Sequence, residues 1–301
     1  MSIDPSIKHQ LSSIRDFIRY GASLFRRRKL FFGHGTDNAW DEAVALVLYA
    51  VDLPAHSGSE VLDACLVEAE KQAVLEVFER RCDHVPAPYI TGEAWFAGLR
   101  FYVDERVLIP RSPIAELISQ QFYPWLTSPP ARILDMCTGS GCIGIASALT
   151  FPEAEVVLTD ISPEALAVAN KNIEAYHLEA SVQCLQSDVF ENVKGVFDLI
   201  VANPPYVDAD DLAAMPGEFH REPVLGLASG PDGLDVTRRL LHKAAEYLNS
   251  GGFLVVEVGN SAWHLEQAFP EVPFNWLEFE QGGDGVFLLY REQLVACAGY
   301  F

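Results

Sequence analysis

Near its middle the sequence runs Ile133-Leu134-Asp135-Met136-Cys137-Thr138-Gly139-Ser140-Gly141-Cys142-Ile143-Gly144, and this stretch indicates the fold class. Its order is that of a buried strand, a glycine-rich turn and a helix. Glycine lets backbone amides approach a ligand closely, and the first turn of a helix offers N–H groups without a partner. We therefore expect a nucleoside-containing ligand to bind at this turn.

Strands and helices alternate on both sides of this stretch. Expected strands cover residues 132–137, 155–160, 181–186 and 197–202, and expected helices cover residues 142–149 and 163–175. A helix at 234–248, a strand at 252–258 and an antiparallel pair at 274–279 and 286–290 follow. This alternation predicts an α/β fold with a parallel, doubly wound sheet.

The N-terminal part of the chain has a different pattern. Its apolar residues recur at helical spacing, as in Ile14, Phe17 and Ile18, which predicts a small helical domain over residues 1–86. Asn38 is expected to begin one of these helices. Residues 95–103 are typical of a β-hairpin that turns at Gly98. The hairpin is expected to connect the helical domain to the sheet, so that residues 87–301 form the second domain.

The amino-acid composition indicates which kinds of partner the protein can bind. The chain has 42 acidic and 21 basic residues, and its net charge of -21 repels a nucleic-acid backbone and suits a cationic macromolecule. The same charge can also serve solubility alone. No apolar run approaches the roughly 18 residues of a membrane span, and the cysteines lack the spacing of a zinc site. We expect a cytoplasmic protein without a metal, a membrane contact or a direct nucleic-acid contact.

The glycine turn does not by itself identify its ligand. Gly139, Gly141 and Gly144 also fit a dinucleotide fingerprint, and Asp160 stands where that pattern requires an acidic residue. Asp135 favours S-adenosylmethionine instead, because a carboxylate there opposes a pyrophosphate and suits the ammonium and sulfonium of a methionine moiety. The alternative is that Asp135 only caps the turn.

Two more acidic residues follow the next two strands. Asp160 is expected to accept hydrogen bonds from the ribose hydroxyls, and Asp188 from the adenine amino group. Each could instead be a helix cap or a turn residue. Their positions favour ligand binding, because open α/β sheets bind ligands at the carboxyl ends of their strands.

The apolar strand 198–202 ends abruptly in Asn203-Pro204-Pro205-Tyr206. The prolines stiffen the turn and remove two N–H donors, which leaves the Asn203 side chain and the Pro204 carbonyl as acceptors for a planar NH2 group. Such a nitrogen is a poor nucleophile, so its orientation toward the methyl group must supply much of the catalysis. Tyr206 can cover the group by stacking. The motif alone fits an amide or an adenine, and an ordinary turn remains the alternative.

The sequence resembles the protein glutamine N-methyltransferases over nearly its whole length. The resemblance is carried by residues 107–111, the Asp135 loop, residues 203–206, Glu222-Pro223, residues 230–234 and residues 257–259. It implies a Rossmann-like, seven-stranded class I methyltransferase domain that uses S-adenosylmethionine. It also implies that Asn203 to Tyr206 hold a glutamine amide and that the N-terminal helices recognise a protein substrate. The implied cofactor site contains Asp135, Thr138, Gly139, Ser140, Gly141, Asp160, Ile161, Asp188 and Asn203.

Some details resemble the branch of this family that acts on large-subunit ribosomal protein L-three. Arg111 is followed by Ser112-Pro113, where release-factor enzymes usually have Pro-Glu-Thr-Glu, and residues 33–38 and 282–287 also match the branch. The resemblance therefore implies a basic ribosomal protein as partner, with a release factor as the nearest alternative.

Two further alternatives remain open. An adenine amino-methyltransferase fits the same motif but needs a basic groove for nucleic acid, which this sequence does not indicate. A ribosome-assembly factor that keeps the cofactor without turnover would not need an intact amide site. His34 and His220 are not expected to act as general bases, because neither adjoins Asn203 in the sequence and water can take the proton.

Overall fold

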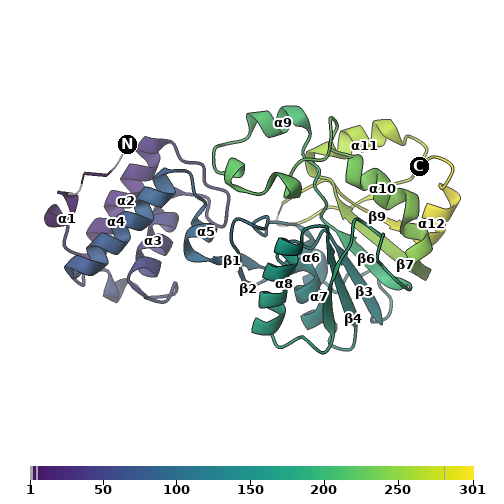
Figure 1. Ribbon diagram of the computed structural model, residues 1–301, viewed down its shortest axis with the longest axis horizontal. Helices are drawn as coiled ribbons and strands as arrows, with labels where there is room; N and C mark the ends of the chain where they lie inside the picture. Colours follow the sequence, from purple (N-terminus) through teal and green to yellow (C-terminus); the bar gives the residue numbers. More distant parts are fainter. Residues whose placement is uncertain (1–2, 5, 281) are drawn as a thin grey trace. The chain divides into compact units, whose positions relative to one another are not determined.

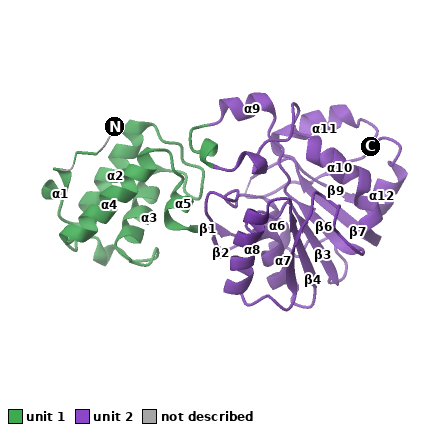
Figure 2. Cartoon of the chain, in the orientation of Figure 1, with its two compact units in different colours: residues 1–93, 216–221 green, residues 94–215, 222–301 purple. Residues whose placement is uncertain are grey.

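The structure is a computed structural model that describes residues 3–4, 6–280 and 282–301. Residues 1–2 and 5, which belong to the expected N-terminal domain, and residue 281 lie outside this description. The chain divides into two compact units, shown in Figure 2: residues 1–93 with 216–221, and residues 94–215 with 222–301. This division differs from the expected one after residue 86, because α5 (Ala87–Thr91) packs Ala87 and Ile90 into the core of unit 1.

Unit 1 is helical. Besides α5 it contains α1 (Ile7–Gln10), α2 (Ile14–Arg28), α3 (Ala39–Ala50), α4 (Glu68–Cys82) and a 3-10 turn at Ser59–Val61. Side chains cap the N-termini of α2 and α3: Ser13 caps α2, and the Asn38 side chain accepts hydrogen bonds from the amides of Trp40 and Asp41, as the sequence predicts. Phe17, Phe25 and Phe78 are fully buried in the core between α2 and α4.

A buried ion cluster lies in unit 1. The guanidinium of Arg81, of which only 1% is exposed, donates to Oε1 of Glu42 at 2.6 Å and to Oε1 of Glu218 at 2.9 Å. It also donates to the carbonyl of Phe31 at 2.6 Å. Glu218 comes from residues 216–221, which follow the Asn-Pro-Pro-Tyr motif at 203–206 in the chain. Arg81 therefore fixes this distant segment within the helical unit.

A sheet forms the centre of unit 2 (Figure 1). It contains β3 (Arg132–Met136), β4 (Glu155–Asp160), β5 (Val182–Gln186), β6 (Phe197–Ala202), β7 (Leu248–Glu257), β8 (Asn275–Trp276) and β9 (Val286–Tyr290). Their order is β5-β4-β3-β6-β7-β9-β8. The first five strands are parallel, and β9 is antiparallel to both β7 and β8. The expected seven-stranded α/β fold is confirmed.

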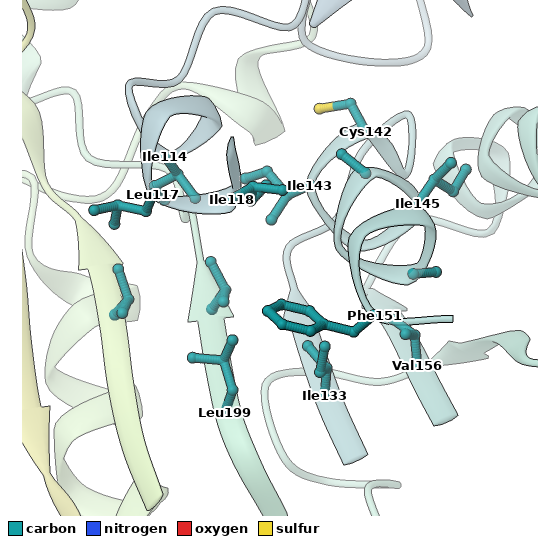
Figure 3. Close-up of a cluster of buried hydrophobic side chains, with 14 of the residues drawn as sticks. Ile114, Leu117, Ile118, Ile133, Cys142, Ile143, Ile145, Phe151, Val156 and Leu199 are labelled. Atoms are coloured by element: carbon teal, nitrogen blue, oxygen red, sulfur yellow. The ribbon is translucent and has the colours of Figure 1, made fainter. Parts of the chain in front are cut away.

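Helices cover both faces of the sheet. One face is packed by α6 (Ile114–Ser119), α7 (Cys142–Thr150) and α8 (Pro163–Ala175), and the other by α10 (Asp235–Lys243), α11 (Ala262–Ala268) and α12 (Arg291–Ala296). Alternate strand residues serve the two cores, because successive side chains of a strand point to opposite faces. Ile133 and Leu199 meet the helices of the first face (Figure 3), whereas Leu134 and Ile200 belong to the second core.

Two expected elements differ in extent. The helix expected over residues 234–248 ends at Lys243, and a 3-10 turn at Ala244–Tyr247 follows it. Leu248 then begins β7, where it pairs with Phe197 of β6. The apolar spacing of Leu240, Leu241 and Leu248 suits a helix, but pairing with the neighbouring strand decides the conformation of Leu248. The expected strand 274–279 is reduced to β8.

The hairpin consists of β1 (Glu93–Phe96) and β2 (Leu99–Tyr102). Ala97 and Gly98 turn with φ of 50° and 74°, which matches the twist of the two strands. The side chain of Asn172 on α8 accepts a hydrogen bond from the amide of Tyr102 at 2.8 Å and donates to its carbonyl at 3.0 Å. The end of the hairpin is therefore attached to the sheet domain.

Candidate active site

The loops that contain the expected site residues meet at the carboxyl ends of adjacent strands. Met136 of β3 pairs with Thr159 of β4 on one side and with Ala202 of β6 on the other. The chain leaves β3 toward β4 and later returns beside β3 as β6, so a topological switch point lies between β3 and β6. Ligands of open α/β sheets bind at such a point.

The glycine loop after β3 has an unusual backbone. Cys137, Gly139 and Gly141 have φ of 59°, 54° and 83°, in the left-handed region that favours glycine. A Cβ atom on Gly141 would lie 3.1 Å from Ile145, and one on Gly144 would clash with Leu158 of β4. The glycines therefore let α7 begin close to the sheet.

The buried side chain of Asp135 holds this loop through hydrogen bonds. Its side chain is fully buried, and Oδ2 accepts hydrogen bonds from the Thr138 hydroxyl at 2.5 Å and the Gly144 amide at 2.8 Å. These are the contacts of a turn cap. Oδ1 is also buried and has no partner among the described residues. Burial raises the pKa of Asp135 to about 7, because desolvation outweighs the two hydrogen bonds.

A cavity of about 260 Å³ opens in unit 2 in front of these loops. Six of the expected site residues line it: Gly139, Asp160, Ile161, Asp188, Asn203 and Pro205. The other expected residues are not among its lining residues; these are Asp135, Thr138, Ser140, Gly141, Pro204 and Tyr206. The structure thus brings residues from the ends of four strands to one cavity.

The two carboxylates of the cavity have different surroundings. Asp160 accepts hydrogen bonds from the amides of Gly139 and Ser162, both at 2.9 Å, and burial raises its pKa. Asp188 is more exposed, and Oδ1 lies 2.8 Å from the guanidinium of Arg239 on α10. Arg239 also lines the cavity. The sequence gave no sign of its role, because Arg239 lies far along the chain from Asp188 in an ordinary amphipathic helix.

Asn203 lines the cavity and has one buried side-chain acceptor. Its Oδ1 is buried and accepts no hydrogen bond from the part of the chain that the structure describes. Leaving a buried polar atom unpaired costs about 1–3 kcal/mol, so such an atom often serves a ligand. Asn203 directly follows Ala202, the last residue of β6, and the buried strand residues Leu199 to Ala202 fix the position of its backbone.

Tyr206 is held at both its backbone and its ring. Its hydroxyl donates to Oε1 of Glu257 at 2.9 Å, and its carbonyl accepts from the Ser261 hydroxyl at 2.7 Å. A Cβ atom on Gly259 would lie 2.7 Å from the Tyr206 ring, so the ring packs directly on that backbone. Burial, together with the Glu257 carboxylate, raises the pKa of Tyr206.

Other motif residues brace the same end of the sheet. Nη1 of Arg111 donates to both carboxylate oxygens of Glu222, at 2.7 and 3.0 Å, and the Ile109 amide donates to Oε2 of Glu222 at 3.1 Å. In the sequence, Glu222 and Glu257 stand out only as parts of the motifs Glu222-Pro223 and 257–259. A carboxylate at the end of an apolar strand was the available signal for Glu257.

His34 and His220, which are not expected to act as general bases, lie in unit 1. His34 is 4% exposed, and its ring centroid lies 4.6 Å from that of Phe219. His220 belongs to the 3-10 turn at Phe219–Arg221. Both belong to the helical unit, and neither lines the cavity.

The fold and the loops at its switch point define a methyltransferase of the Rossmann-like class. A family model described as methyltransferase small domain matches residues 118–218. Among solved structures, a methyltransferase from Pyrococcus furiosus is 20% identical, covers 64% of this chain and 89% of its own, and has a TM-score of 0.47. No helix among the described residues is long and apolar enough to cross a membrane.

Curated relatives are much closer in sequence. A ribosomal protein uL3 glutamine methyltransferase from Neisseria gonorrhoeae is 51% identical over 95% of this chain and 97% of its own. Another from Francisella tularensis is 48% identical over 96% of this chain and 93% of its own. This chain belongs to the family of ribosomal protein uL3 glutamine methyltransferases. The expected resemblance to glutamine N-methyltransferases is thereby confirmed.

Proposed function

We propose that this protein transfers a methyl group from S-adenosylmethionine to the side-chain amide nitrogen of a glutamine in ribosomal protein L3. The observation that carries the proposal is the buried Oδ1 of Asn203, a residue that lines the switch-point cavity: within the described part of the chain this oxygen has no hydrogen-bond partner. An amide NH2 group would supply the donor that this oxygen lacks. The names of relatives that are about half identical to this chain support the same reaction.

The cavity suits the proposed cofactor. When bound, S-adenosylmethionine supplies a methyl group activated by a sulfonium. Asp160 is fixed by two backbone amides and keeps lone pairs that can accept hydrogen bonds from the ribose hydroxyls. Asp188 follows the next strand, β5, and can accept a hydrogen bond from the adenine amino group. Gly139 and Ile161 also line the cavity. Asp135 supports the site indirectly, because its Oδ2 accepts hydrogen bonds from Thr138 and Gly144 and so holds the loop.

The protein contributes orientation to the reaction. An amide nitrogen is a weak nucleophile because its lone pair is delocalised. If Oδ1 of Asn203 and the Pro204 carbonyl each accept one N–H of the glutamine, the lone pair points at the methyl group, and the positive charge that develops on nitrogen is stabilised. Tyr206 covers the planar amide, and water takes the proton released after transfer.

Charge and the helical unit favour a basic protein substrate. An acidic enzyme with a net charge of -21 attracts a basic ribosomal protein and repels the phosphates of a nucleic acid. We assign substrate recognition to the N-terminal helices and place the reaction in the cytoplasm. We propose no direct contact with nucleic acid.

The test offers two proteins in one assay. The enzyme is incubated with methyl-labelled cofactor, unmethylated ribosomal protein L3 and an unmethylated release factor. Label should appear on a glutamine of the ribosomal protein. Label on the release factor alone would favour the other branch, and no label on any glutamine would refute the reaction.

A second comparison separates catalysis from an assembly role. Replacing Asn203 by Ala should abolish labelling, whereas a role as a non-catalytic assembly factor should survive the change. Restored ribosome assembly by the Asn203→Ala variant, in cells that lack the enzyme and need it for assembly, would support the non-catalytic alternative.

A further inference from the structure

Glu257 ends β7 in an apolar setting. The preceding residues Leu254, Val255 and Val256 are fully buried, and Glu257 itself is only 4% exposed. A carboxylate is costly to bury, and burial raises its pKa. A buried carboxylate is retained where its oxygens are used. Both oxygens of Glu257 accept hydrogen bonds: Oε1 from the Tyr206 hydroxyl at 2.9 Å and Oε2 from the Ser112 hydroxyl at 2.5 Å.

Ser112 connects this carboxylate to the start of α6. Its side chain is buried, and its Oγ accepts a hydrogen bond from the Ile114 amide at 3.2 Å while donating to Glu257. The position of the Ser112 hydroxyl is therefore set by the first turn of α6, whose Ile114 is fully buried in the core.

The backbone after Glu257 is braced from a second direction. The amides of Val258 and Gly259 both donate to the carbonyl of Gly285, at 2.7 and 3.2 Å. Gly285 has φ of 67°, and a Cβ atom there would clash with the backbone of Gly259. Gly259 in turn contacts the Tyr206 ring. The segments around Ser112 and Gly285 thus converge on Tyr206 without lining the cavity.

We infer that Glu257 is a positioning residue for substrate, which fixes the Tyr206 ring over the glutamine amide, and that Ser112 and Gly285 set the position of Glu257 and Gly259. The inference rests on the proposed function, because it gives Tyr206 the role of covering the amide. It adds that residues outside the cavity control the geometry of methyl transfer. Both supporting segments are among those by which the sequence resembles the ribosomal-protein branch.

A double-mutant cycle tests the inference. The variants are Glu257→Gln, Tyr206→Phe and the two combined, assayed with unmethylated ribosomal protein L3. Since a displacement of about 1 Å can cost 100-fold in rate, each single variant should lower kcat by about 10- to 100-fold. The KM for S-adenosylmethionine should change little, because neither Tyr206 nor Glu257 belongs to the proposed cofactor site.

The double variant distinguishes positioning from general support of the fold. If Glu257 acts through the Tyr206 hydroxyl, the double variant should be as slow as the slower single variant, within about twofold, because coupled residues are not additive. If the losses of kcat in the two single variants multiply in the double variant, the inference is wrong. So would a normal kcat in Tyr206→Phe beside a low kcat in Glu257→Gln.

Matched controls and a second cycle guard against a folding defect. Tyr247→Phe removes a hydroxyl that bonds the Phe190 carbonyl at 3.4 Å, and Ser147→Ala removes a buried hydroxyl within α7; both should keep normal kcat. If Glu257→Gln does not fold, Ser112→Ala with Tyr206→Phe forms an equivalent cycle with the same expected non-additivity. Failure of the wild-type enzyme to methylate glutamine would instead refute the proposed function.

Discussion

Oδ2 of Asp135 accepts a hydrogen bond of 2.8 Å from the amide of Gly144, across the full length of the glycine loop. The loop therefore starts at a strand end and closes on the side chain of that same strand. Gly144 is needed at the other end because a side chain there would clash with Leu158. The glycines of this fingerprint thus have two roles. Gly144 shapes the loop, and Gly139 lines the cavity where a ligand can bind.

Replacing Asp135 by Asn should change how stability depends on pH. Burial raises the pKa of Asp135 from 3.8 to about 7, so the native state keeps a proton that the unfolded chain releases above pH 4. The stability contributed by the protonated form is fully present below pH 4 and is lost as pH rises through about 7. Denaturant unfolding of the cofactor-free protein should therefore show the wild type losing about 3 kcal/mol more than Asp135→Asn between pH 5 and pH 8. Parallel pH profiles would contradict the ionisation of a buried Asp135.

Replacing Asn203 by Ala should reduce catalysis far more than cofactor binding. Loss of one preorganised hydrogen-bonding group in a catalytic site typically lowers kcat by about 100- to 1000-fold. The measurement is kcat at saturating cofactor, beside the Kd of S-adenosylhomocysteine by calorimetry. Asn170→Ala, on the exposed face of α8, is the matched control and should be neutral. A normal kcat at saturating cofactor beside a weaker affinity would assign Asn203 to the cofactor alone.

Replacing Asp160 by Ala should weaken cofactor binding. A hydrogen bond to a charged group contributes about 1.5–3 kcal/mol, which corresponds to about 10- to 100-fold in Kd. Asp188→Ala should cost less, because this side chain is 38% exposed and already pairs with Arg239. Titration of S-adenosylhomocysteine into each variant measures both effects. A larger loss of affinity in Asp188→Ala than in Asp160→Ala would contradict the proposed roles of the two carboxylates.

Replacing Arg81 by Met should destabilise the helical unit. It would leave the carboxylates of Glu42 and Glu218 buried without their cation, and breaking a buried pair in this way costs about 3–5 kcal/mol. Thermal unfolding followed by circular dichroism measures the change. Arg15→Met removes an exposed ion pair with Asp63 and should leave the melting temperature unchanged. A small loss in Arg81→Met would show that the cluster relaxes or admits water.

Local patterns in the sequence predicted most of the elements. The strand at Phe197–Ala202 and the helix at Pro163–Ala175 have the predicted bounds, and Asn38 caps its helix as predicted. Strand ends were informative because parallel strands bring their carboxyl ends to one edge. Leu248 was misassigned to a helix, since its apolar spacing fits a helix and only its pairing with Phe197 makes it a strand residue.

By itself, the sequence determined the α/β class, the order of strands and helices, and the loops that carry Asp160, Asp188 and Asn203, because these depend on spacing along the chain. Only the tertiary structure decided which partner each buried polar group has. Glu257 meets Tyr206 and Ser112, and Arg81 meets Glu218, across 51, 145 and 137 positions of the chain. No periodicity encodes such pairs, since they follow from how whole elements pack and from the high cost of burying a charge without a partner.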